Sequence, residues 1–424
     1  MNIPKVKGTY DVLPSDSYKW QALEKEIHHV CKLYNIHEIR TPIMEYSDVF
    51  HRQSEQSDMV TKETYNFLDK SERLLTLRPE GTAGIMRSYV EHKLYASQDV
   101  EKVYYLGPNF RYERPQKGRY RQFSQFGVEA IGALNPSLDA EIIMLSYDFI
   151  QRLGLKGVTV KINSLGDLES QKTYKNALIK HFQPHQETLC KDCQQRIDKN
   201  PLRILDCKID QNHQAVIDAP SPFDFLSADA SAYHKDVLKH LDEANIPYQT
   251  SNRLVRGLDY YSHTVFEIEA NIKGFGAQNV LGGGGRYQNL IKELGGPDVG
   301  GIGFAFGMER LLIALEAENI RLDQEPTLDA YIITMNQTFK PLALNLLYEL
   351  RKLNIVCDMN YSNKAFKGQL KQALKQEAKY LLILGEDELN EQKVSVKNTK
   401  DETQEKVSLH QLNDYLLKQL ENNI

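Results

Sequence analysis

Long apolar segments are absent from this sequence. It has no apolar stretch of about 18 residues, and its start, Met1-Asn-Ile-Pro-Lys-Val-Lys-Gly8, lacks the apolar run of a signal peptide. A membrane-spanning helix needs about 20 consecutive, mainly apolar residues, and a secretory signal needs a shorter apolar core. We therefore expect a cytoplasmic protein without a membrane partner.

Cysteine is also scarce. The chain has 5 cysteines, an odd number that argues against a disulfide framework. Cys190 and Cys193 form a Cys-x-x-Cys pair, and together with Cys207 they hint at zinc. A fourth ligand would have to be His185 or His213, and neither spacing is convincing. We therefore expect buried structural thiols and no structural metal.

An excess of positive charge is missing as well. Lys and Arg number 52 against 57 Asp and Glu, which gives a formal net charge of −5. No overall field therefore attracts nucleic acid, and any contact with a polyanion must depend on local charge. Hydrophobic residues at 41% exclude a wholly disordered chain. The length of 424 residues predicts about two to four domains.

Periodicity divides the first half of the chain into elements. Apolar residues at helical spacing predict a helix over 16–34, with Ser15 or Asp16 as its N-cap, before an extended segment at 38–42. Alternation then predicts a long β-hairpin within 103–131, whose strands flank a basic loop. Residues 170–235 have shorter apolar periods and are rich in Gln, Lys, Asp and His, which predicts an inserted helical subdomain.

The second half alternates between strands and helices. It begins with strands at 254–270 and 278–282, a Gly-rich segment at 282–285, and a strand and helix within 299–318. The polar stretch 321–326 marks a domain boundary. An α/β domain should follow, with its strands at 329–334, 355–358 and 380–384 and its helices at 341–353 and 364–379.

The hairpin carries side chains suited to a ligand. Because side chains alternate along a strand, Gln125, Gly127 and Glu129 share one face, and a small ligand could lie on the floor at the glycine. Near the turn stand Arg111, Arg114, Lys117, Arg119 and Arg121, which together could bind phosphate. The alternative is a solvated basic turn.

Two further segments carry chemistry, although neither matches a standard nucleotide loop. In Gly301-Ile-Gly-Phe-Ala-Phe-Gly307 a Phe replaces the third glycine of the dinucleotide fingerprint, and the P-loop ending is absent. Arg310 follows in the first turn of a helix, where a cation opposes the dipole unless an anion lies beside it. The alternative for Arg310 is a surface salt bridge.

The run 254–266 concentrates Arg256, Asp259, Tyr260, Tyr261 and His263. Paired tyrosines are commonly core or interface residues, which is the alternative to a binding role.

The segment Leu77-Arg-Pro-Glu-Gly-Thr-Ala-Gly84 joins a strand to a helix. At this junction we expect Glu80 and Thr82 to point towards whatever lies beyond the end of the strand. The alternative is that Thr82 is simply the N-cap of the helix.

Together these segments resemble the histidyl-tRNA synthetases, a family of class II aminoacyl-tRNA synthetases. The likeness runs from Lys7-Gly-Thr-Tyr-Asp11 to the last domain. The helix and strand ending at Pro42 look like class II motif 1, Phe110 to Glu129 looks like motif 2, and Gly303 to Arg310 looks like motif 3. The segments 114–123 and 256–261, the latter Arg-Gly-Leu-Asp-Tyr-Tyr, are specific to the histidine enzymes.

The resemblance implies a fold and a domain order. It implies an α+β catalytic domain over 1–322, built on an antiparallel sheet, with a helical insertion at 170–235. An α/β anticodon-binding domain over 327–424 would follow, and motif 1 implies a homodimer. Two rivals remain, a regulatory subunit of histidine biosynthesis with the same fold and a class II synthetase for another amino acid.

The resemblance also implies the substrates and their contacts. ATP with Mg²⁺ and L-histidine would form histidyl-adenylate, and histidine tRNA would accept the histidyl group. Arg111 and Arg256 would be catalytic, and ATP would be bound by Arg111, Glu113, Arg119 and Arg310. Histidine would be bound by Glu80, Thr82, Gln125, Glu129, Tyr260 and Tyr261.

Overall fold

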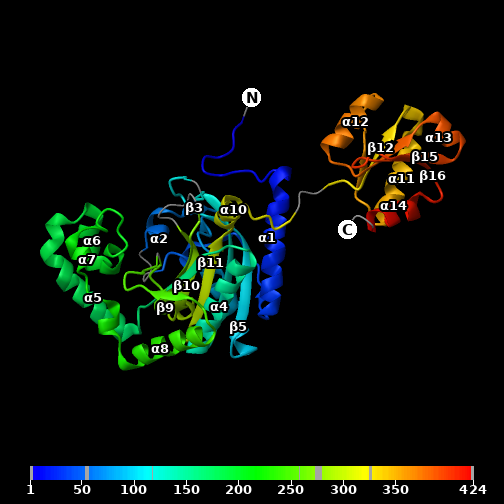
Figure 1. The fold of residues 1–424 in the computed structure, drawn as a ribbon. Coiled ribbons are helices and arrows are strands. Elements are labelled where there is room, and N and C mark those ends of the chain that lie inside the picture. Colours follow the sequence, from blue (N-terminus) through cyan, green and yellow to red (C-terminus); the bar gives the residue numbers. More distant parts are fainter. Residues whose placement is uncertain are drawn as a thin grey trace. The chain divides into compact units, whose positions relative to one another are not determined.

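The chain folds into two compact units, Met1–Asp323 and Gln324–Ile424 (Figure 1). The computed structural model describes residues 3–52, 57–116, 118–256, 258–272, 279–323 and 327–421. Lys117 of the basic loop and Gly257 of the segment 256–261 lie outside these residues. Within the described residues, no helix combines the length and the apolar character that crossing a membrane requires.

An eight-stranded sheet forms the centre of the first unit, in the order β1-β5-β6-β11-β10-β9-β7-β8. All neighbours from β5 to β7 in this order pair antiparallel, and the short edge strands β1 and β8 pair parallel. In that order the strands are β1 (His37–Glu38), β5 (Glu101–Phe110), β6 (Gln122–Ile131), β11 (Gly301–Gly307), β10 (Val280–Tyr287), β9 (Tyr261–Ala270), β7 (Val158–Ser164) and β8 (Tyr248–Thr250). This arrangement confirms the α+β fold built on an antiparallel sheet.

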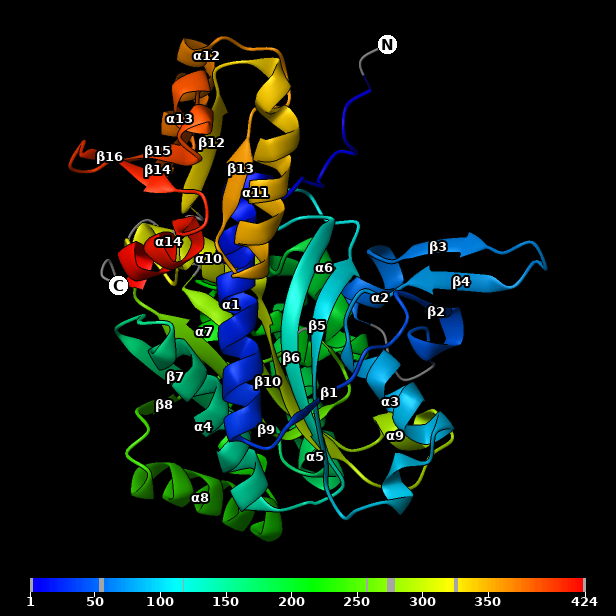
Figure 2. The ribbon, with the colours of Figure 1, turned by 90° about the vertical axis from the view of Figure 1, so that its right-hand side faces the viewer.

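Helices cover one face of this sheet (Figure 2). They are α1 (Pro14–Leu33), α4 (Pro136–Arg152) and α10 (Met308–Ala317). The core between these helices and the sheet consists of apolar side chains. Phe126, Phe304 and Phe306 point from the strands into this core, where Phe149 of α4 lies 5.0 Å from Phe126 between ring centroids. Helix α1 begins at Pro14 and its N-cap is Leu13, so the predicted cap at Ser15 or Asp16 is wrong. Proline suits the first turn because the N–H that it lacks has no helical partner there.

The opposite face of the sheet is only partly covered. There α3 (Thr82–Glu91) and α9 (Leu290–Glu293) pack on Tyr105, Ile131 and Tyr287. A small sheet, in the order β2-β4-β3, flanks α3 and leads into it. It consists of β2 (Met44–Tyr46), β4 (Leu74–Leu77) and β3 (Tyr65–Leu68), with α2 (Asp58–Lys62) beside them in the chain. The predicted hairpin is confirmed, with Tyr105 paired to Gly127.

The Gly-rich segment is part of a strand, which corrects the prediction. Gly282 to Gly285 lie in the middle of β10, and β9 begins only at Tyr261. A Cβ on Gly284 would overlap the carbonyl oxygen of Gly303, and one on Gly283 would overlap that of Phe266. Glycine is therefore required because the neighbouring backbones approach too closely for a side chain.

Between β7 and β9 the chain is mainly helical. Its helices are α5 (Leu168–Phe182), α6 (Lys191–Lys199), α7 (Gln214–Ile217) and α8 (Ala228–Glu243), with the short 3₁₀ helix η4 (Pro201–Ile204) after α6. Tyr174, Leu178, Phe182 and Ile197 belong to a hydrophobic core that is separate from the core of the main sheet. In Figure 1, α5, α6 and α7 gather beside the main sheet. We call this helical segment the insertion.

The second unit has a five-stranded sheet in the order β13-β12-β14-β15-β16. Strands β12, β13 and β14 are parallel, and β15 and β16 continue the sheet antiparallel. Its strands are β12 (Ala330–Thr334), β13 (Cys357–Met359), β14 (Tyr380–Leu384), β15 (Lys393–Asn398) and β16 (Gln404–Ser408). Its helices are α11 (Lys340–Lys352), α12 (Phe366–Lys375), α13 (Glu386–Asn390) and α14 (Leu412–Glu421).

Helix α12 is shorter than the predicted 364–379. Its N-cap Ala365 is extended, and Glu377 has φ of 51°, a left-handed conformation in which a helix cannot continue. Lys364 and Lys379 therefore lie outside the helix, and Lys379 forms a 2.8 Å ion pair with Asp329. Only Lys367, Lys371 and Lys375 of the predicted lysine stripe remain on the helix.

Candidate active site

A buried carboxyl group, that of Glu129, lies on the partly covered face of the main sheet. Strand β6 pairs Glu129 with Gly303 of β11, and a Cβ at that glycine would overlap the carboxylate. The Thr82 hydroxyl donates to Glu129 Oε1 at 2.6 Å, and the Tyr287 hydroxyl donates to Oε2 at 2.8 Å. Burial raises the pKa of Glu129 to about 8. Burial disfavours the ionised form of this carboxyl, so a positively charged ligand group beside it would be stabilising.

The start of α3 supplies a second carboxylate. The Glu80 carboxylate accepts hydrogen bonds from the backbone N–H of Thr82 at 2.7 Å and of Ala83 at 2.9 Å. A negative charge at this end of a helix is stabilised by the helix dipole. Gly81 is the N-cap residue, so the alternative in which Thr82 acts as the N-cap is wrong. The hydroxyl of Thr82 is directed instead at Glu129.

The ring of Tyr105 covers the floor that we expected to be open at Gly127. A Cβ at Gly127 or at Gly81 would overlap this ring, so the ring lies in the space that the two glycines leave. Burial raises the pKa of Tyr105 well above its usual value, and nearby Glu129 and Glu80 add to this effect. The site is therefore narrower than the strand pattern alone implies.

Aromatic side chains form one wall of the site. The rings of Tyr260 and Tyr261 lie 4.9 Å apart, and the rings of Tyr260 and Tyr287 lie 5.8 Å apart. Burial raises the pKa of Tyr261, and its hydroxyl is therefore a neutral donor. This wall combines apolar ring faces with hydroxyl groups.

Gln125 lies on the same strand face as Glu129. Its amide oxygen accepts a hydrogen bond of 2.6 Å from Nδ2 of the fully buried Asn109. This bond fixes the orientation of the Gln125 amide, and its NH₂ group can donate to a ligand.

Arg256 lies behind the tyrosines and pairs with a carboxylate. Its Nη1 is 2.6 Å from Glu267 Oε1, and Gly283 leaves room for the guanidinium. Its Nε is buried and has no hydrogen-bond partner within the described part of the chain. A buried donor without a partner is costly, so an acceptor from a ligand would stabilise this arrangement.

Three charged groups converge at the turn end of the hairpin. Arg119 Nη1 lies 3.4 Å from Glu113 Oε2, and Arg111 Nη1 lies 4.0 Å from Oε1 of the same carboxylate. Arg111 is held by a 2.8 Å bond from its Nε to the Pro79 carbonyl and by the Phe123 ring at 5.2 Å. These contacts leave one carboxylate between two guanidinium groups.

Arg310 joins this charged group from α10. Its Nη1 donates to the Val280 carbonyl at 2.8 Å, and the residue is partly buried. Burial lowers the pKa of Arg310, and the nearby positive charge of Arg119 lowers it further. Two neighbouring guanidinium groups repel each other, so an anion between them would relieve the repulsion.

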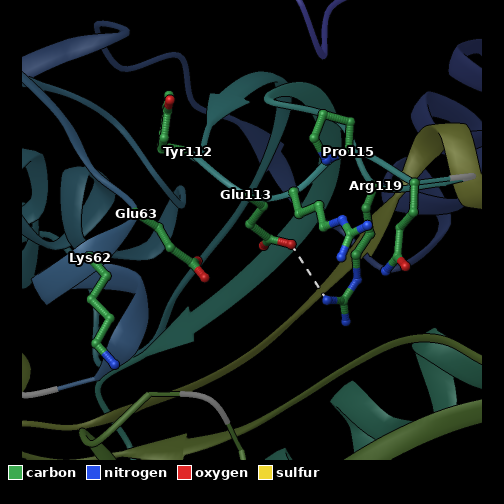
Figure 3. A pocket seen from close by; sticks show the side chains of 8 residues that line it. Lys62, Glu63, Tyr112, Glu113, Pro115 and Arg119 are labelled. Atoms are coloured by element: carbon green, nitrogen blue, oxygen red, sulfur yellow. Dashed lines mark hydrogen bonds and ion pairs between the residues drawn. The ribbon is translucent and has the colours of Figure 1, made fainter.

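A cavity of about 600 Å³ opens beside these arginines (Figure 3). In Figure 3, Glu113 and Arg119 point toward each other across it, and Lys62 lies at the other side. It is lined by Lys62, Glu63, Tyr112, Glu113, Arg114, Pro115, Gln116 and Arg119. Arg121 is packed on Tyr112, with its guanidinium carbon 3.9 Å from the ring centroid. The basic loop therefore borders a cavity of suitable size for part of a nucleotide.

Two known families match this chain. The family described as "Histidyl-tRNA synthetase" matches residues 8–311, well over half of the chain. The chain belongs to this family. The family described as "Anticodon binding domain" matches residues 329–419.

Relatives of the histidyl-tRNA synthetase family match along the whole chain. The histidine–tRNA ligase of Acholeplasma laidlawii is 58% identical, covering 98% of this chain and 99% of that protein. The histidine–tRNA ligase of Lysinibacillus sphaericus is 49% identical, covering 99% of this chain and 100% of that protein. The crystal structure of apo S. aureus histidyl-tRNA synthetase has 43% identity and a TM-score of 0.84, covering 98% and 100%.

One solved structure bears on the regulatory rival. A protein of Bacillus halodurans titled as an ATP phosphoribosyltransferase regulatory subunit/histidyl-tRNA synthetase has a TM-score of 0.65 at 20% identity. At that identity the likeness shows a shared fold alone.

The structure brings the expected residues of this synthetase into two neighbouring groups. Glu80, Thr82, Tyr260 and Tyr261 lie around the buried carboxyl of Glu129, and Arg111 and Arg119 lie with Glu113 at the hairpin turn. Sequence reasoning missed Tyr105 and Tyr287. The hairpin register could have revealed Tyr105, because it pairs directly with Gly127. No local pattern indicates that Tyr287 contacts Glu129, from which it is separated by 158 positions.

Proposed function

We propose that this chain is a histidine–tRNA ligase. It activates L-histidine with ATP to give histidyl-adenylate and pyrophosphate, and then transfers the histidyl group to the 3′ end of histidine tRNA, releasing AMP. The observation that carries this proposal is the buried carboxyl of Glu129, enclosed by hydroxyl groups beside a group of arginines. Its full-length likeness to histidine–tRNA ligases supports the same reaction.

Glu129 and Tyr261 bind the imidazole of histidine in this proposal. The Glu129 carboxyl has hydrogen-bonding capacity left beyond the bonds from Thr82 and Tyr287, because a protonated carboxyl offers one O–H donor as well as acceptor sites. An apolar amino acid would leave these buried polar groups unpaired, which gives strong rejection without an editing step. Tyr260 lines the same pocket.

The backbone end of histidine is held by a different set of groups. Glu80 attracts the α-ammonium group, and Thr82 and Gln125 bind the region around the ammonium and carboxylate. The Gln125 amide is already oriented by Asn109. These contacts place the carboxylate towards the arginines, where it can attack the α-phosphate of ATP.

The chemistry of the first step needs alignment and charge neutralisation. The attacking carboxylate of histidine is ionised near neutral pH, so no general base is required. Arg111 contacts the α-phosphate, and Arg256 stabilises the charge that builds there as pyrophosphate leaves. Positioned cations of this kind supply several kcal/mol. The unpartnered Nε of Arg256 is a donor available for this purpose.

The remaining charged groups bind the rest of ATP. Arg119 and Arg310, whose charges repel in the absence of a ligand, hold the γ-phosphate end, and Glu113 lies on the adenine side. Magnesium arrives with ATP as part of the substrate, and it usually keeps several waters and one or two carboxylate ligands. Glu267, a carboxylate paired with Arg256, fits this demand.

Two other parts of the chain bind the tRNA. The unit at 327–424 recognises the anticodon, and the insertion at 170–235 contacts the acceptor arm. The catalytic domain, which we place at 1–322, carries out both chemical steps. The protein acts as a homodimer in the cytoplasm, where protein synthesis takes place.

The test is amino-acid-dependent exchange of pyrophosphate into ATP, with each of the standard amino acids supplied alone. Stimulation by histidine only is the expected result. Stimulation by a different amino acid would indicate another class II synthetase. Absence of exchange with every amino acid would indicate a regulatory protein that keeps only the fold.

A further inference from the structure

The insertion contains a compact group of metal-binding side chains that are not part of the candidate active site. The ligand atoms of Cys190, Cys193, Cys207 and Asp210 all lie within 4.8 Å of one another. Cys190 Sγ and Cys207 Sγ are 3.8 Å apart, so they form no disulfide. Cys193, Cys207 and Asp210 are buried, and Cys190 is partly exposed.

Two short segments supply these four side chains. Cys190 is the N-cap residue of α6 and Cys193 lies in its first turn, whereas Cys207 and Asp210 follow η4. Each pair is separated by two residues, so the pattern is that of two Cys-x-x-Cys pairs with an aspartate in the last position. Sequence reasoning considered histidine as the fourth ligand and overlooked this aspartate.

One of the two histidines that we considered from the sequence, His213, has other contacts. His213 Nε2 lies 3.0 Å from the Thr188 hydroxyl, and its Nδ1 accepts from the backbone N–H of Ala215 at 3.2 Å. The Asp210 carboxylate instead lies beside the three cysteine thiols. It accepts a hydrogen bond of 3.0 Å from the backbone N–H of Cys190. This bond orients the carboxylate in the way that hydrogen bonds commonly orient metal ligands.

We propose that Cys190, Cys193, Cys207 and Asp210 bind one structural zinc ion. Zinc takes tetrahedral sites with Zn–S distances of about 2.3 Å, which place two sulfur ligands about 3.8 Å apart. The Cys190–Cys207 separation of 3.8 Å therefore already matches a loaded site. Thiolate ligands favour zinc over magnesium and calcium, which prefer oxygen. With four protein ligands the site has no open position, so the ion is structural.

The location gives the ion a physical purpose. The insertion has a small hydrophobic core that includes Cys193 and Cys207, and small units commonly need a metal or disulfide to reach adequate stability. Zinc would join the N-terminus of α6 to the segment after η4.

The same segment borders the candidate active site. Asn200 Nδ2 donates to Asp259 Oδ1 at 2.7 Å, and Arg203 Nη1 donates to the Arg256 carbonyl at 3.2 Å. Both donors lie between the two ligand pairs in the chain. Zinc would therefore hold the segment that positions the backbone at Arg256, which couples the insertion to the catalytic arginine.

Metal titration of the reduced, full-length protein tests this proposal independently of the ligase activity. Co²⁺ should produce thiolate-to-cobalt charge-transfer bands and the visible bands of a tetrahedral site, saturating at one ion per chain. Zn²⁺ should then displace the cobalt and remove the bands. Absence of these bands from the wild-type chain, or formation of a Cys190–Cys207 disulfide with no metal uptake, would overturn the proposal.

Single variants assign the ligands. Cys207→Ser and Asp210→Asn should weaken Co²⁺ binding roughly tenfold or more. Asp210→Cys should keep the site and strengthen its charge-transfer bands, so it remains informative if the other variants fold poorly. Cys357→Ser is the matched control, because Cys357 is a buried thiol in the second unit. An unchanged cobalt spectrum in Cys207→Ser would contradict the assignment.

Discussion

At the scale of single residues, Glu129 shows how burial sets the chemistry of the site. The folded protein keeps its carboxyl protonated up to about pH 8, because burial raises the pKa from 4.5. The unfolded chain ionises the same group near its usual pKa. Burial of Glu129 therefore costs no stability at low pH and costs progressively more as the pH rises through this window.

Glu129→Gln should remove this pH dependence. Relative to the wild type, we expect the variant to gain stability between about pH 5 and pH 8, by at most about 1.4 kcal/mol per pH unit. Calorimetric melting of the ligand-free proteins at both pH values measures the difference. Glu187→Gln, at an exposed position, is the control. A difference between Glu129→Gln and wild type that stays constant with pH would contradict the raised pKa.

Arg256→Lys should impair the first chemical step. Lysine keeps the positive charge beside Glu267 but lacks the Nε donor and the planar fork of arginine. We expect histidine-dependent pyrophosphate exchange to fall about 100-fold or more, with little change in the KM for histidine. Arg253→Lys, at an exposed position nearby, should leave exchange unchanged. Normal exchange in Arg256→Lys would remove Arg256 from the mechanism.

At the scale of elements, close packing of β9, β10 and β11 depends on glycine. A Cβ on Gly284 would overlap the Gly303 carbonyl of the neighbouring strand, whereas one on Gly307 would lie 3.8 Å from Arg310 Cβ. Gly284→Ala should therefore lower stability by about 1–3 kcal/mol or more. Gly307→Ala should be nearly neutral. Urea unfolding compares the two variants, and equal midpoints would argue against the close strand packing.

Helix α12 tests whether local basic charge binds RNA. Because Lys364 and Lys379 lie outside this helix, we expect the double variant Lys367→Glu, Lys371→Glu to be the informative one. It should weaken histidine tRNA binding and flatten the plot of log affinity against log salt by about two units, one per lost phosphate contact. Lys400→Glu, on an exposed turn outside the helix, controls for the effect of a charge reversal elsewhere on the second unit. An unchanged slope would leave α12 as a solvated face.

At the scale of the whole molecule, the two units have separate hydrophobic cores. One core lies between the main sheet and α1, α4 and α10, and the other lies within the five-stranded sheet and its helices. A chain ending at Asp323 should therefore fold and retain histidine-dependent pyrophosphate exchange. Its aminoacylation of histidine tRNA should fall sharply, because the anticodon-binding unit is removed. Loss of exchange in a folded truncated chain would mean that the second unit contributes to activation.

Much of the architecture could be predicted from local patterns. The long hairpin follows from alternation in β5 and β6, and the parallel strands of the second unit follow from short apolar runs. The Gly-rich part of β10 could not be recognised as a strand, because glycine has a low strand propensity. Glycine is needed there because the backbones of the two neighbouring strands leave no room for a side chain. Likewise β15, β16 and α14 were not predicted, since their patterns are short and mixed with charge.

The sequence by itself determined the family, the basic residues of the hairpin and the placement of Gln125 and Glu129 on the same face of one strand. These features depend on residue identity and on the two-residue period of a strand. Only the tertiary structure decided that Glu129 holds its proton, that Tyr105 narrows the floor and that Asp210 joins three cysteines. Such properties arise from burial and from contacts between distant positions, as between Thr82 and Glu129, 47 residues apart.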